Sequence, residues 1–189
     1  MKLGNPLSRE IVATEEGKIY TYRGTEEPSD RNQEHNMWVY DMKTDEMKMT
    51  DYKITEGFWN GQATTRDGKK IYVSTSNGEL YVLNTETGKI DRLTHFLPKE
   101  NYENNERIQY FYSITLSKDE KSIYAIPSNT LGNLYEYNIE KKSVTLVKKL
   151  EDAIYTGNNI KDSKGNLYFG NFKAWEGKCR LLVINNTNK

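Results

Sequence analysis

Residues 66–76 read RDGKKIYVSTS, which is a charged turn containing a glycine, then an aliphatic–aromatic pair, then an alternating strand. The arrangement occurs three more times, as EEGKIYTYRG from Glu15, KDEKSIYAIPS from Lys118 and SKGNLYFGNF from Ser163. The first aliphatic residues of the four copies are Ile19, Ile71, Ile123 and Leu167, so successive copies lie 52, 52 and 44 residues apart. A turn of this kind before alternating apolar residues indicates a β-hairpin, and its recurrence indicates a repeat protein.

Each copy is flanked by further strand patterns. One strand precedes it, in SREIVAT from Ser8, WNGQATT from Trp59, FYSITLS from Phe111 and TGNNIKD from Thr156. Another follows it, usually with a short polar turn and a fourth strand, in MWVYDMKTDEMKM from Met37, ELYVLNTETGKIDRL from Glu79, NLYEYNIEKKSVTLV from Asn133 and RLLVINNTNK from Arg180. Four antiparallel strands at this period are typical of a β-propeller blade.

We therefore expect an all-β fold, a β-propeller of four recognisable four-stranded blades within one domain. The expected blades cover residues 7–54, 57–96, 109–150 and 153–189. A composition of 35% hydrophobic and 29% charged residues suits thin sheets with wet edges better than a thick helical core. Helical solenoids do not fit because the apolar spacing is two, and a β-sandwich gives no reason for one turn to recur.

Closure of the ring has two possible explanations. The fourth unit ends at RLLVINNTNK without an outermost strand, and the opening residues MKLGNP are short for a strand. We expect a part of a larger ring rather than a minimally closed four-bladed ring. An open ring leaves a strand edge and two sheet faces uncovered, so self-association is also expected in that case.

The charge and cysteine content limit the classes of binding partner that the chain is expected to have. Lys plus Arg and Asp plus Glu number 27 each, so no net field attracts nucleic acid, and no apolar run is long enough to span a membrane. The single cysteine, Cys179, has no intrachain partner for a disulfide. We expect a cytoplasmic protein from the chain as written, or a secreted or periplasmic one if it belongs to a longer precursor.

The loops differ between the two ends of the predicted blades. The turns between third and fourth strands are short, whereas the connections at the opposite end include RGTEEPSDRNQEHN from Arg23 and HFLPKENYENNER from His95. Long loops on a rigid scaffold commonly carry binding residues, so a small molecule, a carbohydrate or a protein is expected on this elaborated face. Trp59 and Trp175 lie in or beside these loops, where an indole can stack on a ligand.

Polar residues also gather at the start of each innermost strand, which lines the channel of a propeller. The candidate ligand-binding residues are Arg9, Trp59, Asn60, Gln62, Tyr112, Ser113, Asn159 and Trp175. Carboxylate and amide oxygens at such a mouth are ligands for a hard divalent cation such as calcium.

The run WNGQATTRDGKKIYVST from Trp59 resembles a segment of gluconolactonase and senescence-marker-type propellers. In that family the asparagine of the segment is a ligand of a divalent metal. The resemblance implies a metal site at Asn60, with Glu10 and Asn158 as further ligands. Two functions remain open at this point: a non-catalytic ligand- or protein-binding module, and a metal-dependent propeller hydrolase, lactonase or lyase with its site at the channel mouth.

Overall fold

The computed structural model describes residues 7–23, 35–54, 59–75, 78–96, 114–127, 133–149, 155–173 and 178–185. These residues form fifteen strands in four antiparallel sheets, and none of them is helical. In each sheet the strands follow one another in chain order, which is the simple meander expected of a propeller blade. The described residues include no helix that could span a membrane.

The first blade contains β1 (Leu7–Ala13), β2 (Lys18–Arg23), β3 (His35–Asp41) and β4 (Glu46–Ile54), and the second contains β5 (Trp59–Thr64), β6 (Lys70–Thr75), β7 (Glu79–Asn84) and β8 (Ile90–His95). The third contains β9 (Ile114–Leu116), β10 (Ser122–Ala125), β11 (Leu134–Asn138) and β12 (Ser143–Lys148). The fourth has three strands among the described residues: β13 (Tyr155–Lys161), β14 (Leu167–Lys173) and β15 (Lys178–Ile184).

A common turn joins the first two strands of every blade. The backbone N–H groups of Gly17, Gly68, Glu120 and Gly165 each donate to the carbonyl three residues earlier, at 2.9 to 3.1 Å. All four residues have positive φ, between 61° and 89°. Glycine adopts this left-handed backbone without strain, which explains the glycine in three of the four repeats. Glu120 is the exception.

A second recurring contact ties the outer half of a blade to this turn. The N–H groups of Met42, Thr85 and Ile139, each just after the third strand, donate to the carbonyls of Gly17, Lys69 and Lys121 respectively, all at 2.9 Å. This end of a blade is therefore closed by backbone hydrogen bonds as well as by side-chain packing.

The hydrophobic core lies between blades, in three clusters. The first joins Val12, Tyr20 and Met37 to Ile71, Val73, Tyr81 and Leu83 of the second blade. The second joins Tyr72, Leu80 and Phe96 to Ile114, Leu116, Ile123, Ala125, Tyr135 and Tyr137 of the third. The third joins Tyr124, Ile126 and Leu134 to Leu167 and Phe169 of the fourth. Burial of apolar side chains between sheets thus stabilises blade-to-blade stacking.

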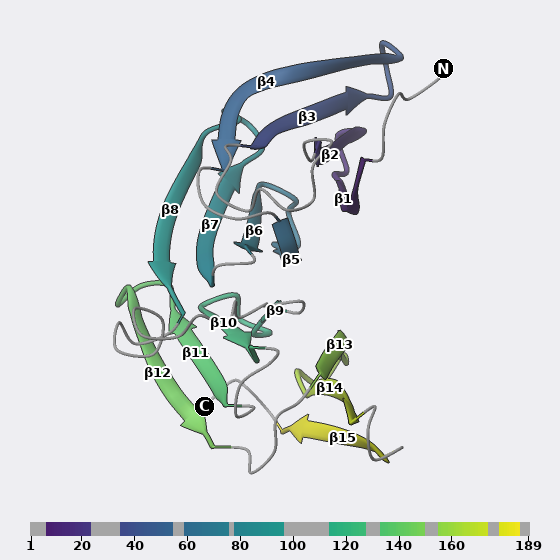
Figure 1. Cartoon of the computed structure of the whole chain (residues 1–189). Helices are drawn as coiled ribbons and strands as arrows, with labels where there is room; N and C mark the ends of the chain where they lie inside the picture. Colours follow the sequence, from purple (N-terminus) through teal and green to yellow (C-terminus); the bar gives the residue numbers. More distant parts are fainter. Residues whose placement is uncertain are drawn as a thin grey trace.

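The blades form an open arc, with their first strands on the concave side (Figure 1). Strand β1 contacts β5, β5 contacts β9 and β9 contacts β13. The repeats and their strand order confirm the predicted all-β propeller architecture.

Candidate functional site

The predicted channel-mouth residues lie on the inner strands, at points where the pairing with the second strand is irregular. In β1 three residues, 8–10, face one residue of β2 between the pairs Leu7–Arg23 and Ile11–Thr21. In β5, Asn60 is the extra residue between the pairs Trp59–Thr75 and Gly61–Ser74. In β13, residues 157–158 face one residue of β14. Bulges of this kind re-aim side chains and are frequent next to active sites.

Glu10, Asn60 and Asn158, the predicted metal ligands, all fall within these bulged segments, as does Arg9. They therefore lie at the same end of the inner strands of the first, second and fourth blades. Asn159 pairs with Phe169 at the edge of its bulge, and Gln62 is half-buried with its Oε1 atom shielded from solvent. Tyr112, Ser113 and Trp175 lie outside the described residues.

A metal site at this mouth stays a prediction. Among the side chains that the structure describes, no three His, Cys, Asp or Glu groups come together to hold a metal ion. The side chains of Glu10, Asn60 and Asn158 are not among those described.

The opposite end of the inner strands carries a row of contacts between neighbouring turns. The Arg66 backbone N–H donates to Glu120 Oε1 at 2.8 Å, and the Arg66 guanidinium donates to the carbonyl of Lys118 at 2.5 Å. Lys161 Nζ lies 3.4 Å from the carbonyl oxygen of Ser117. Burial lowers the pKa of Lys161, with Arg66 adding to this effect and Glu120 opposing it. These contacts fix the turns of adjacent blades against one another.

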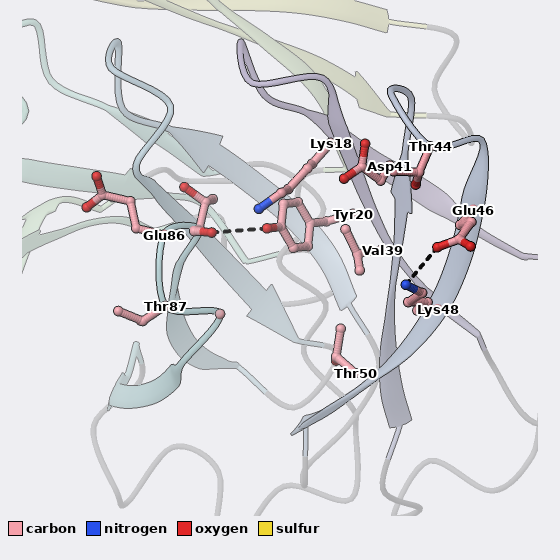
Figure 2. Close-up of a pocket in the computed structure, with 12 residues that line it drawn as sticks. Lys18, Tyr20, Val39, Asp41, Thr44, Glu46, Lys48, Thr50, Glu86 and Thr87 are labelled. Carbon is pink, nitrogen blue, oxygen red and sulfur yellow. Dashed lines mark hydrogen bonds and ion pairs between the residues drawn. The ribbon is translucent and has the colours of Figure 1, made fainter.

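A groove of about 290 Å³ opens between the first two blades. One wall is the face of the first sheet that points toward the second blade, and the other is the β7–β8 turn (Figure 2). Its lining residues are Lys18, Tyr20, Val39, Asp41, Thr44, Glu46, Lys48, Thr50, Thr85, Glu86, Thr87 and Gly88. The groove therefore lies at the end of the blades that has the short turns, away from the predicted mouth.

Hydrogen bonds shape the floor of this groove. The Tyr20 hydroxyl donates to the carbonyl of Thr85 in the next blade at 3.2 Å, so the tyrosine links the two walls. The Thr50 hydroxyl donates to the carbonyl of Met37 at 2.9 Å. The Asn84 carboxamide accepts from the N–H groups of Glu86 and Thr87, both at 3.0 Å, which holds the β7–β8 turn in shape.

The rim of the groove carries both signs of charge. Lys48 pairs with Glu46 at 2.7 Å, and this neighbour holds the pKa of Lys48 above its usual value. Glu86 pairs with Lys69 at 2.7 Å and raises the pKa of that lysine. These groups are exposed, so a ligand can compete for each pair at little cost.

Most of the lining residues are polar or charged. Threonine hydroxyls donate and accept, and charged rims orient a ligand. The hydroxyls of Tyr20 and Thr50 donate to backbone carbonyls, and no histidine or cysteine belongs to the lining.

Sequence reasoning missed the groove because its walls come from two blades. The β7–β8 turn reads NTETG, one of the short turns assigned to the plain face, and Val39 and Thr50 look like ordinary strand residues. The available signal was the run of threonines and alternating charges through residues 41–50 and 84–88.

Comparison with known proteins supports the fold alone. No protein-family model matches the chain, and no curated protein matches its sequence. Many solved structures resemble it in fold, and three of them illustrate the likeness. A Bacteroides thetaiotaomicron protein of unknown function is 18% identical with a TM-score of 0.61, over 90% of this chain and 42% of that one. Hydrazine synthase of Kuenenia stuttgartiensis is 12% identical with a TM-score of 0.59, over 93% and 48% respectively.

The third structure is the β-propeller domain of Cps50 (Swd1) from Myceliophteria thermophila. It is 14% identical with a TM-score of 0.63, and the match covers 90% of this chain and 49% of that domain. The chain is thus a set of β-propeller blades that spans less than half the length of each of these structures. A likeness to the gluconolactonase family is not among these findings and stays a prediction.

Proposed function

We propose that this chain is a non-catalytic β-propeller module that binds a short, extended, polar segment of a partner protein in the groove between its first two blades. The observation that carries the proposal is the groove itself, with two lysines and three carboxylates around threonine hydroxyls.

The chemistry of the lining favours a peptide over other ligands. Thr44, Thr50 and Thr87 contribute hydroxyl groups, which complement the N–H and C=O groups of an extended backbone. The fourth threonine of the lining, Thr85, is buried, and its hydroxyl donates to the Gly68 carbonyl. Lys18 and Lys48 can pair with acidic side chains in place of their exposed neighbours Glu16 and Glu46. Asp41 can pair with basic side chains. A carbohydrate commonly needs an open aromatic face to stack on, whereas Tyr20, the aromatic residue of the lining, is only 4% exposed.

The experiment begins with a displayed library of random short peptides, selected on the immobilised chain. Selected peptides are then measured by fluorescence anisotropy against three proteins: the wild type, Lys48→Glu and Lys148→Glu. Lys48 lies on β4 in the groove, and Lys148 lies on β12, the matching outermost strand of the third blade. Both lysines are exposed, so both variants should fold.

We expect Lys48→Glu to weaken binding about tenfold, since a charge-assisted hydrogen bond contributes about 1.5–3 kcal/mol and tenfold corresponds to about 1.4 kcal/mol. Lys148→Glu should bind as the wild type does. Equal binding by all three proteins refutes the groove as the site. Loss of binding in Trp59→Ala instead, or a rise in melting temperature with calcium that Asn60→Ala abolishes, would move the site to the predicted channel mouth.

A further inference from the structure

Three tyrosines occupy the same position on the second strands of the first three blades and face the following blade. Tyr20, Tyr72 and Tyr124 are 4%, 3% and 7% exposed. Each belongs to one of the three clusters between blades. Burial raises the pKa of Tyr124 to about 12, with Glu136 adding to the shift. The position is therefore a standard element of the blade-to-blade interface.

The fourth blade has the same interface residues on its outward face, but they are uncovered. Tyr168 occupies the tyrosine position and pairs with Val183 on the next strand. Leu181 lies two residues before Val183 and therefore on the same face of the sheet. Leu181 is 64% exposed, whereas its equivalents Met37, Leu80 and Leu134 are 1%, 0% and 1% exposed. Ile160 on the same face is 68% exposed.

The outward face of the first blade, at the other end of the arc, also carries apolar residues that are only partly covered. Ile19 stands at the position of Ile71, Ile123 and Leu167, all of which are fully buried, yet Ile19 itself is only half-buried. Beside it on this face lie Trp38 and Tyr40, also half-buried, and Met49, which pairs with Trp38 and is 57% exposed.

We propose that the outward face of β13–β15 docks on the outward face of β1–β4 of a second copy, so that two copies close one ring through two identical interfaces. Each new contact would repeat the stacking that already joins the first blade to the second, the second to the third and the third to the fourth. A head-to-tail interface of this kind makes a ring when the rotation closes.

The size of the arc supports two copies. In Figure 1 the first and fourth blades lie at the two ends of an open arc. The chain matches 49% of a β-propeller domain, so two copies supply about as much structure as one such domain. Eight sheets lie within the usual range of about 4–8 propeller blades.

The test is the mass of the full chain in solution, measured by light scattering over a range of concentrations. The expected mass is that of two chains of 22.0 kDa each. Leu181→Asp and Met49→Asp should each give monomers, since each places a carboxylate in both interfaces. Leu146→Asp is the matched control, because Leu146 is 41% exposed but lies on β12, away from both end faces. It should remain a dimer. Circular dichroism confirms that all three variants fold.

Mixing the two monomeric variants tests the head-to-tail geometry. The unaltered first blade of Leu181→Asp can still meet the unaltered fourth blade of Met49→Asp, so the mixture should recover a heterodimer held by one interface. A monomeric wild type, a mass that grows without limit, or a mixture that stays monomeric overturns the proposal.

Discussion

Glu120 of the third blade accepts a hydrogen bond from the backbone N–H of Arg66 in the second, at 2.8 Å, and its own φ is 61°. The other three blades have glycine at this point of the turn. A left-handed backbone costs a residue with a side chain about 1–2 kcal/mol, and here the side chain makes a contact across the blade boundary. The contact between Arg66 and Glu120 explains why this repeat departs from glycine.

Replacing Glu120 separates the two effects. Glu120→Ala should lower the free energy of unfolding by about 1–2 kcal/mol, because the contact is lost and the strained backbone remains. Glu120→Gly should lose less, since glycine adopts this φ freely. Urea unfolding measures both. A larger loss for glycine than for alanine would show that the backbone at this position is not strained.

The pair formed by Glu79 and Arg92 gives a second prediction. Glu79 is 2% exposed, and its carboxylate accepts two hydrogen bonds from the Arg92 guanidinium, both at 2.5 Å. Arg92→Met leaves a buried carboxylate without this partner and should cost about 3–5 kcal/mol. Adding Glu79→Leu should recover most of that loss, because an apolar pair avoids the buried charge. Thermal unfolding of the single variant Arg92→Met and of the double variant measures both effects. Equal stability of the two variants would contradict the prediction.

The carboxylate of Asp162 gives a prediction about the stability of the fold at acidic pH. Burial tends to raise its pKa, but hydrogen bonds from Asn166, Tyr168 and the Lys164 backbone lower it more, to about 2 from the ordinary 3.8. A carboxylate with a depressed pKa stabilises the fold above pH 4 and loses this contribution as the pH falls toward 2. Asp162→Asn should therefore be less stable than the wild type at neutral pH, and the difference should shrink between pH 4 and 2.

The control for this experiment is Asp51→Asn, which alters an exposed carboxylate on β4. This variant controls for the loss of one carboxylate outside the hydrogen-bonded cluster of Asp162. Chemical unfolding at a series of pH values provides the readout. A stability difference for Asp162→Asn that stays constant between pH 4 and 2 would exclude the depressed pKa.

Two leucines at the same repeat position give a fourth prediction. Leu134 is 1% exposed and Leu181 is 64% exposed. In solutions dilute enough to keep single chains, Leu134→Ala should cost about 2–5 kcal/mol, because a buried cavity forms. Leu181→Ala should change the stability by less than about 0.5 kcal/mol. Urea unfolding of the two variants side by side makes the comparison, and similar losses would mean that the fourth blade is already covered.

The blades were predictable from sequence because each one repeats a local pattern. The aliphatic anchors of the second, third and fourth repeats are fully buried, as a strand that faces a neighbouring sheet requires. The turn glycines also follow from local conformation, since Gly17, Gly68 and Gly165 all have positive φ. Local patterns of this kind can be recognised in a single sequence without knowledge of the contacts between strands.

The groove was not predictable for the opposite reason. Tyr20 reads as one more strand tyrosine, and only the structure shows its hydroxyl 3.2 Å from the Thr85 carbonyl of the next blade. The bulges at Glu10, Asn60 and Asn158 are likewise a matter of register between strands, which depends on both partners. The repeat pattern predicts that these residues lie at one end of the inner strands, but it does not identify the bulges that contain them.

The backbone hydrogen bonds donated by Met42, Thr85 and Ile139 limit where the sequence can accept insertions during evolution. They fasten three of the blades at one end, through carbonyls that any residue supplies. Insertions at the other end leave those ties untouched, so loop length there can drift without loss of pairing. The loops at that other end are therefore the natural place for grafting new peptide segments onto the scaffold.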